Sequence, residues 1–407
     1  MNRNRRIHKT DSHSGVRIFW GWAAVLTTII YISWRVFFTL PDYRTYGWLA
    51  AVLGVILAAA ECSAMLEGTE HFIRLQRKVI PEKPEVPREW YPEVDVLIAT
   101  HNEDAELLFK TVNGCIHMDY PDKTKVHIYL CDDSGRPEVA RLAAEMGVGY
   151  CAMKENRHAK AGNLNNAMSM TDSPWVVTLD ADMIPMQNFL TEVVPYTFLP
   201  VMKKLEDGTW AKRTAGEMDG SFRIGFIQTP QSFYNPDLFQ FNFFSEKRIP
   251  NEQDFFFKEV NVGRNKANAP IYAGSNTLLS RQALNEAGGF ATGTVTEDFE
   301  TGLRIQSKGY TCYAIDKILA HGDSESAGDG AASIPSEGCI SYGTQDLNLI
   351  QNAATCPASC TGGPFYGGLY IFQLPFWQFC QVFPWWSAAW RVSSLSGFLH
   401  ICSIIRR

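Results

Sequence analysis

The feature that most constrains the fold is a regular alternation of strand-like and helix-like segments between residues 94 and 182. Short apolar runs, which are typical of buried strands, alternate with longer amphipathic runs that are typical of helices. Such a succession implies a mostly parallel sheet with right-handed crossovers, and therefore an α/β domain. The predicted strands are Val94–Thr100, Val126–Cys131 and Val176–Leu179, and the predicted helices are Ala105–Ile116, Pro137–Met146 and Ala161–Met170.

Polar residues follow each of the three predicted strands. These are Thr100-His-Asn-Glu103, Asp132-Asp133-Ser-Gly135 and Asp180-Ala-Asp182. A solvated loop explains any one of them. Because open α/β sheets bind ligands outside the carboxyl ends of their strands, three in succession favour a ligand site.

Asp180 and Asp182 are one residue apart, so an extended chain would point both carboxylates the same way. An Asp-x-Asp also occurs by chance in chains of this size. However, Mg²⁺ is typically held by one or two carboxylates together with phosphate oxygens, so the pair predicts a metal–diphosphate site. Lys160 could supply a positive charge to a phosphate, and Gly162 would allow close backbone approach.

A further helix is predicted to begin at Thr296-Glu-Asp298 and to continue to Gly309. Taken alone, this motif is explained by helix capping, with Thr296 as the N-cap and acidic residues favoured by the helix dipole.

Composition excludes some classes. The chain has 407 residues and a net charge of −6, which argues against nucleic acid as a partner. Its ten cysteines form no CxxC pair and no zinc-like spacing with histidine. We therefore expect reduced thiols and a cytosolic catalytic part.

The amino-terminal region predicts a transmembrane hairpin over residues 18–66, preceded by a basic segment, residues 1–17. Two apolar stretches, residues 18–40 and 46–66, each approach the ~20 residues that cross a hydrocarbon core. Basic residues on both outer sides place both ends on the cytoplasmic face, with membrane lipid as a partner. Glu61 inside the second stretch is either a functional residue or a marker of the membrane interface, and we favour the interface.

Residues 67–90 contain Pro81-Glu-Lys-Pro-Glu-Val-Pro87 and predict a stiff, charged linker. The catalytic domain is then expected over residues 91–325, and residues 326–407 form an atypical tail.

The ordered motifs resemble the family 2 glycosyltransferases, and more narrowly the catalytic subunit of bacterial cellulose synthase and its processive relatives. The resemblance covers residues 94–323 and extends to the preceding hairpin. It rests on Thr100-x-Asn-Glu103, Asp132-Asp133, Lys160-Ala-Gly-Asn-Leu-Asn165, Asp180-x-Asp182, Gln228-Thr-Pro230, Asn235-Pro-Asp237, Tyr272-Ala-Gly-Ser275 and Thr296-Glu-Asp298.

This resemblance implies a GT-A fold, a Rossmann-like nucleotide-sugar domain, on the cytoplasmic face of a multi-pass protein of the inner (plasma) membrane. It implies inverting transfer of a sugar, most simply glucose from UDP-glucose, to a growing β-linked polysaccharide. Further synthase subunits are possible partners.

Carried over by position, Asp298 is the expected general base, and Asp180 and Asp182 are expected to hold Mg²⁺ or Mn²⁺ at the diphosphate. Thr100, Glu103 and Asp133 are expected at the uridine and ribose, and Lys160 beside the diphosphate. The other substrate-binding residues that the resemblance implies are Asn102, Asp132, Asn163, Asn165, Tyr272, Gly274, Ser275 and Glu297.

The resemblance stops near Glu325. The Gln-x-x-Arg-Trp motif of the family is missing there, and the tail is poor in Arg and Lys but rich in Ser, Gly, Cys and aromatic residues. The tail is a diverged membrane segment, a disordered segment or, as we prefer, the translation of a shifted reading frame. In the last case the chain should bind donor better than it polymerises.

Other functions stay open. Within the class they are hyaluronan-type or chitin-type synthesis, or transfer to a lipid carrier. In a different class, the chain is a catalytically impaired, truncated membrane subunit that binds nucleotide sugars. A dinucleotide-binding oxidoreductase is disfavoured because no G-x-G-x-x-G follows the first strand.

Overall fold

The computed structural model describes residues 14–76, 78–153, 158–236, 251–294 and 296–322, together with residues 240, 244 and 248. These residues belong to two compact units, which divide between Lys78 and Val79 within the predicted linker. The predicted tail, with its three interpretations, lies outside the described residues, as does the basic segment up to residue 13.

The amino-terminal unit consists of two helices, α1 (Ser14–Phe38) and α2 (Tyr43–Leu75). Both are long and apolar enough to cross a membrane, and most of their large apolar side chains are exposed. Helix α2 continues past the predicted end at Leu66, so the first part of the predicted linker is helical. An Arg74–Glu70 ion pair one turn apart supports this extension.

Glu61 of α2 has a partner on the other helix. Arg35 Nε donates a hydrogen bond to Glu61 Oε2 at 2.9 Å, and the Tyr31 hydroxyl lies 3.4 Å from the same oxygen. The two charges therefore neutralise one another between the apolar helices. This pairing is a more specific role than the interface marker expected from sequence.

The second unit begins at Val79 and contains the expected catalytic domain, so it is called the catalytic unit here. It is built on a seven-stranded sheet with the order β11-β8-β10-β4-β1-β2-β3. All neighbouring strands are parallel except β10, which runs antiparallel to both β4 and β8, so the sheet is mostly parallel as predicted. The strands are β1 (Val94–Thr100), β2 (Val126–Asp132), β3 (Gly149–Ala152), β4 (Trp175–Asp180), β8 (Ile224–Gln228), β10 (Thr277–Ser280) and β11 (Thr311–Ala314).

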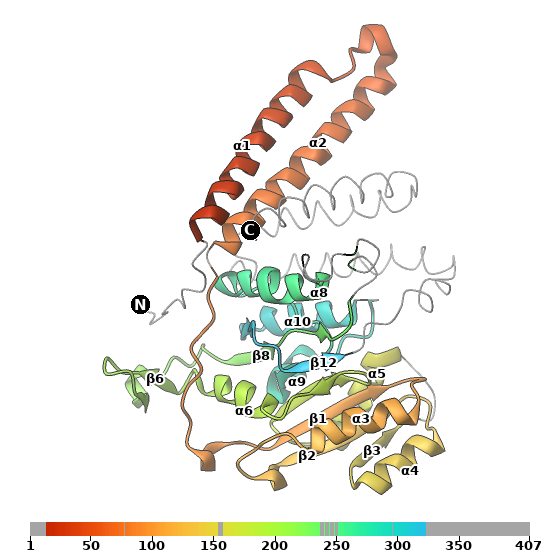
Figure 1. The fold of residues 1–407 in the computed structure, drawn as a ribbon, viewed down its shortest axis with the longest axis vertical. Coiled ribbons are helices and arrows are strands. Elements are labelled where there is room, and N and C mark those ends of the chain that lie inside the picture. Colours follow the sequence, from red (N-terminus) through yellow and green to blue (C-terminus); the bar gives the residue numbers. More distant parts are fainter. Residues whose placement is uncertain are drawn as a thin grey trace. The chain divides into compact units, whose positions relative to one another are not determined.

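Apolar residues fill both faces of this sheet. Along β1, Val96 and Ile98 belong to one buried cluster, whereas Leu97 and Ala99 belong to another. Successive side chains of a strand point to opposite faces, so the domain has three layers. Helices α3 (Ala105–Ile116), α4 (Pro137–Met146) and α6 (Phe189–Val193) contribute to the first cluster, and α5 (Ala159–Met170), α9 (Arg281–Ala287) and α10 (Glu297–Ser307) to the second (Figure 1).

The segment after Val79 packs on the catalytic unit. Ile80 and Val86 contact its apolar core, and Lys83 forms an ion pair with Glu192 at 3.0 Å. The proline-rich stretch is therefore held along the domain by partly buried apolar side chains as well as by charges. The composition predicts a stiff, charged linker but does not indicate these contacts.

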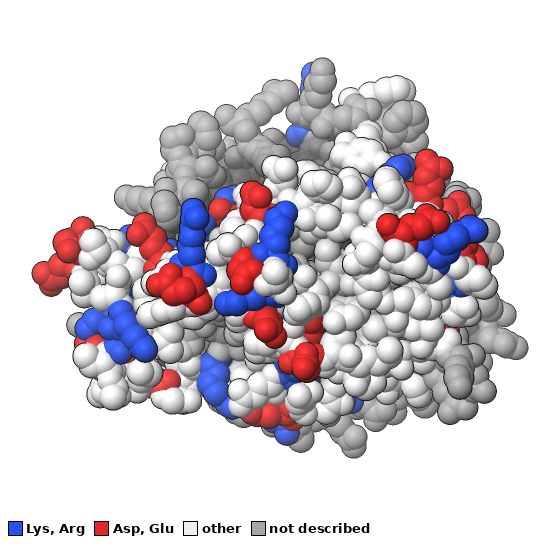
Figure 2. Space-filling view, turned by 90° about the horizontal axis from the view of Figure 1, so that it is seen from below, with Lys and Arg blue, Asp and Glu red and all other residues white. Residues whose placement is uncertain are grey.

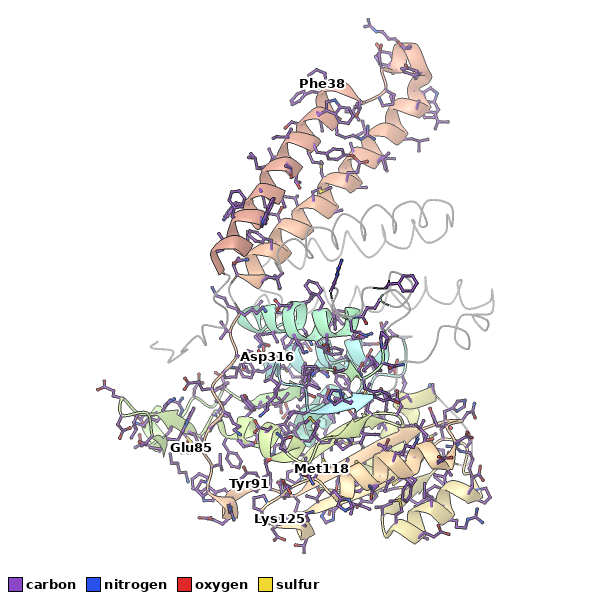
Figure 3. The ribbon with its side chains drawn as sticks, viewed as in Figure 1. Phe38, Glu85, Tyr91, Met118, Lys125 and Asp316 are labelled. Carbon is purple, nitrogen blue, oxygen red and sulfur yellow. The ribbon has the colours of Figure 1, made fainter. Side chains whose placement is uncertain are left out.

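The amino end of the central strands is closed by aromatic packing. The side chains of Tyr91, Met118 and Lys125 lie near one another there (Figure 3), and Lys125 Nζ donates to the Tyr91 carbonyl at 2.8 Å. Tyr91 and Tyr120 meet edge to face. This end of the sheet is thus packed, while the polar motifs lie at the other end.

Two smaller sheets complete the described part of the unit. One has the order β5-β12-β9 and the other pairs β6 with β7.

On the face seen in Figure 2, acidic and basic side chains are interspersed. The remaining elements are β5 (Ile184–Pro185), β6 (Met202–Lys204), β7 (Trp210–Lys212), β9 (Ser232–Phe233), β12 (Ala320–Gly322), α8 (Glu252–Phe255), a π-helical segment (Phe256–Asn261) and short 3-10 turns (Arg88–Trp90, Lys123–Lys125, Val194–Phe198, Ala215–Glu217, Asn265–Ala267).

Candidate active site

The three polar motifs meet at one edge of the sheet, as predicted. Thr100 at the end of β1 is in register with Asp132 of β2, and Ala99 is in register with Asp180 of β4. Because these strands are parallel, their carboxyl ends form a common edge at which a ligand can contact all three loops.

The turn after β1 holds Glu103 in a fixed position. Glu103 Oε2 accepts hydrogen bonds from the Thr100 hydroxyl and from the His101 backbone N–H, each at 2.7 Å. Burial opposes the charge on Glu103, but these hydrogen bonds and the nearby Arg136 outweigh it and hold the pKa of Glu103 below its ordinary value. Glu103 is therefore ionised at neutral pH and can accept hydrogen bonds from a ligand.

The two aspartates after β2 have different surroundings. Asp132 is fully buried, and its carboxylate accepts hydrogen bonds from the Tyr150 hydroxyl at 2.9 Å and from Arg136 Nε at 3.1 Å. Asp133 Oδ2 lies 2.8 Å from Nδ1 of His101, whose side chain is 55 % exposed. Asp133 thus lies beside an accessible side chain, whereas Asp132 is bonded within the protein, which sequence alone did not indicate.

The predicted diphosphate region contains an ion pair. Lys160, in the first turn of α5, pairs with Asp180 at the end of β4. Burial lowers the pKa of Lys160, but Asp180, and to a smaller degree Glu297 and Asp298, raise it overall. The ammonium group therefore stays charged and could form an ion pair with a phosphate in place of the one with Asp180.

The carboxylates fit a divalent ion that is shared with a diphosphate. Asp180 ends β4, and Asp182 lies in the turn before β5. They supply the oxygen ligands that Mg²⁺ and Mn²⁺ prefer. Within the part of the chain that the structure describes, no group of three or more His, Cys, Asp or Glu could hold a metal. The ion would take its other ligands from phosphate oxygens and water.

Asp298 faces Lys160 across Gly274. A Cβ atom added to Gly274 would lie 3.2 Å from Lys160 Nζ and 3.3 Å from Asp298 Oδ2. Gly274 has a φ of +77°, a conformation that favours glycine. Both charged groups therefore converge on a point that only a glycine leaves open.

Glu297 and Asp298 at the start of α10 both have a pKa raised above its ordinary value. Burial raises the pKa of both Asp298 and Glu297, although Lys160 acts in the opposite direction. Asp298 Oδ1 accepts a hydrogen bond from the Phe299 N–H at 2.7 Å, which orients its carboxylate. A carboxylate with a raised pKa and a fixed orientation is suited to accept a proton.

The loop of residues 272–275 is tied to the sheet. The Ser275 hydroxyl accepts from the Asp180 N–H at 2.8 Å, and the buried Tyr272 hydroxyl lies 3.2 Å from that of Thr178. Gln228 Nε2 donates to the Ser275 carbonyl at 2.8 Å. Ser275 and Tyr272, both predicted to bind substrate, thus also position the loop that carries Gly274.

The predicted asparagines differ in their contacts. Asn163 is buried, and its Nδ2 donates to the Cys131 carbonyl at 2.5 Å, while its Oδ1 has no hydrogen-bond partner among the described residues. Asn165 exchanges two hydrogen bonds of 2.8 Å with the backbone of Phe290, so it joins α5 to the α9–α10 loop. Asn102 is exposed in the turn after β1.

Sequence reasoning missed three contributors to the site: His101, Arg136 and Gln228. Arg136 lies four residues after Asp132 and contacts the turns after both β1 and β2. That short spacing between opposite charges was a usable signal. His101 and Gln228 lie in the motifs Thr100-x-Asn-Glu103 and Gln228-Thr-Pro230, but their contacts with Asp133 and with the 272–275 loop join distant segments, which those motifs do not indicate.

Comparison with known proteins agrees with this geometry. The family described as "Glycosyltransferase like family 2" matches residues 92–329. The chain is 36 % identical over 310 residues to the cellulose synthase 1 catalytic subunit [UDP-forming] of Komagataeibacter xylinus, covering 75 % of this chain and 38 % of that protein. It is 32 % identical over 291 residues to the cellulose synthase catalytic subunit [UDP-forming] of Pseudomonas fluorescens, covering 70 % of this chain and 36 % of the relative.

The chain therefore spans less than two fifths of these relatives' length. Among solved structures, the mannosyltransferase PcManGT from Pyrobaculum calidifontis, in complex with GDP-Man and Mn²⁺, superposes with a TM-score of 0.53 at 18 % identity, covering 86 % of this chain and 88 % of that one. At this identity the match concerns the fold alone. From the family match, the relatives and the mixed sheet, we conclude that the chain belongs to the family 2 glycosyltransferases and has the GT-A fold.

Proposed function

We propose that this glycosyltransferase is membrane-bound and transfers a sugar, most simply glucose, from a UDP-sugar to the growing end of a β-linked polysaccharide with inversion at the sugar C1. The observation that carries the proposal is the convergence of Lys160 and Asp298 beside Gly274, with Asp180 bonded to Lys160. A cation for the leaving diphosphate and a carboxylate for the acceptor hydroxyl meet at one place.

The nucleoside would lie at the turns after β1 and β2. There the ionised Glu103 and the carboxylate of Asp133 offer hydrogen-bond acceptors to its hydroxyl and N–H groups. The half-exposed His101 stands at the edge of this region. These groups bind and orient the donor.

The diphosphate would lie at the end of β4. Lys160 provides a positive charge that stabilises the charge developing on the leaving group. A divalent ion held by Asp180 and Asp182 would add a second positive charge there.

Asp298 would take the proton of the acceptor hydroxyl. Its raised pKa makes it a stronger base than an exposed aspartate, and a placed base typically contributes about 10²- to 10⁴-fold in rate. Inversion follows when this base acts on the face of the sugar opposite to the leaving group.

The similar proteins support the donor class. Two relatives are described as UDP-forming cellulose synthase catalytic subunits. The two apolar helices support attachment to the plasma membrane, with the catalytic unit in the cytoplasm.

The test is UDP release by the full chain in membrane vesicles with Mn²⁺ or Mg²⁺ and a panel of UDP-sugars. We expect UDP-glucose to be turned over fastest and its product to be digested by a β-1,4-glucanase. Preference for UDP-N-acetylglucosamine would indicate chitin-type or hyaluronan-type synthesis, and an organic-extractable product would indicate a lipid carrier. Binding of UDP without release from any UDP-sugar would contradict the proposed transfer.

A further inference from the structure

A partly buried arginine connects the two turns that would hold the donor nucleoside. Arg136 precedes α4, and its side chain is 16 % exposed. Its Nε donates to Asp132 Oδ1 at 3.1 Å, its Nη1 to the Glu103 carbonyl at 2.8 Å and its Nη2 to the Thr100 hydroxyl at 2.6 Å. One guanidinium thus bonds both the turn after β1 and the end of β2.

The chemistry of these groups fixes the direction of the hydrogen bonds. Arginine is always protonated in proteins and can only donate, whereas a threonine hydroxyl has one proton to give. Because Thr100 Oγ1 accepts from Arg136, its own proton is directed to Glu103 Oε2, 2.7 Å away. The bonds form a relay in which each strengthens the next.

Asp132 holds the arginine in place. It is fully buried, and it also accepts hydrogen bonds from the backbone N–H of Arg136 at 2.5 Å and from the Tyr150 hydroxyl at 2.9 Å. With these donors its carboxylate is directed toward the protein interior. The consecutive aspartates thus divide their roles, with Asp132 bonded to Arg136 and Asp133 beside the exposed His101.

We propose that Arg136 is a positioning residue for donor binding: fixed by Asp132, it orients the Thr100 hydroxyl, which in turn holds the carboxylate of Glu103 toward the donor nucleoside. This inference rests on the proposed function, because it requires a nucleotide at this edge of the sheet. The charged groups around Glu103 are Arg136, Asp132 and the pair of His101 with Asp133.

The experiment measures UDP binding to the full chain in nanodiscs by calorimetry, for wild type, Arg136→Met and Arg136→Lys. Arg141→Met is the matched control, because Arg141 lies on α4, the helix that follows Arg136, with a side chain 74 % exposed. We expect Arg136→Met to weaken UDP binding by about tenfold to hundredfold, the range for losing hydrogen bonds to a charged group. The control should bind as wild type does.

Two further readouts separate positioning from simple loss of structure. Without Arg136 the pKa of Glu103 should rise, so UDP affinity should decline at a higher pH on acidification than it does in wild type. Arg136→Lys keeps the positive charge but lacks the planar guanidinium that donates to three groups. Compared with Arg136→Met, it should therefore bring the pH profile back toward wild type more fully than the UDP affinity. If Arg136→Met does not fold, Thr100→Val breaks the same relay and should shift the pH profile in the same direction, whereas Thr100→Ser should not.

Folded Arg136 and Thr100→Val variants with wild-type affinity and pH profile would overturn this inference and leave the proposed function intact. Failure of wild type itself to bind UDP would instead overturn the proposed function.

Discussion

Lys160 Nζ and Asp298 Oδ2 converge on the open side of Gly274, at 3.2 Å and 3.3 Å from the position that a Cβ atom would occupy. The two groups come from α5 and α10, which are far apart in the sequence. The catalytic unit thus brings a cation and a carboxylate together at the end of β4.

Replacing Gly274 with alanine should inactivate the site. The new methyl group would press on both charged groups, and the φ of +77° adds a backbone cost of about 1–2 kcal/mol for a residue with a Cβ. Gly208→Ala is the matched control, because Gly208 has a φ of +92° and no atom within 4 Å of its added Cβ. Both variants should lose similar thermal stability, but only Gly274→Ala should lose UDP release. Equal activity of the two variants would show that the space beside Gly274 is not needed.

Lys160→Met should weaken the binding of UDP but not of uridine. UDP carries the diphosphate that Lys160 is expected to neutralise, and loss of a charged hydrogen bond should raise its Kd by about tenfold to hundredfold. Lys204→Met is the control, since Lys204 forms a comparable half-buried ion pair with Glu82 at 2.6 Å. Calorimetric titration with both ligands measures the difference. An equal effect on uridine would place Lys160 at the nucleoside or show a general loss of structure.

Lowering the pH should inactivate the enzyme, because Asp298 becomes protonated and can no longer accept a proton. It should also remove the unfavourable contribution that the buried Asp298 carboxylate makes to the free energy of folding. Burial raises the pKa of Asp298, so the folded state binds a proton more readily than the unfolded chain does. Stability from this group therefore decreases as pH rises from its ordinary pKa through the raised one. Asp298→Asn removes that cost, and we expect its melting temperature at neutral pH to exceed that of wild type. A lower melting temperature of the variant at neutral pH, with no difference in acid, would show that the carboxylate stabilises the fold.

The Arg35–Glu61 pair should fix the two apolar helices against one another. Removing one partner, as in Glu61→Gln, should lower the free energy of unfolding in mixed micelles by about 1 kcal/mol, the size of polar contacts between membrane helices. The charge swap Arg35→Glu with Glu61→Arg should restore part of the loss. Glu70→Gln, which breaks only the pair with Arg74 within α2, is the control and should have little effect. No recovery in the charge swap would argue against the pair as the source of stability.

Strands and helices with strong local patterns could be predicted from sequence. The bounds of β1 and α3 agree with the prediction, because a mostly apolar run, in which Asp95 is the one charged residue, and an amphipathic period are local signals. The sequence also predicted that Thr100, Asp132 and Asp180 lie at one edge of the sheet, because the carboxyl ends of parallel strands meet there.

Features that depend on distant partners could not be predicted. Strand β10 is short and fully buried, and its antiparallel direction is set by its pairing with β4 and β8. Likewise, the hydrogen bonds between the Asn165 amide and the backbone of Phe290 join segments far apart in the sequence. The separate surroundings of Asp132 and Asp133 depend in part on Tyr150 and His101, which lie on other segments and which no local pattern brings to the two aspartates.

The most direct measurement of the central claim compares wild type with Asp298→Asn in two assays on the full chain in nanodiscs, UDP binding by calorimetry and UDP release from UDP-glucose. The account predicts that the variant binds UDP with nearly the wild-type Kd and releases it about 10²- to 10⁴-fold more slowly, as expected for the loss of a placed base. Near-normal UDP release by the variant would contradict the account, because Asp298 could then not be the base.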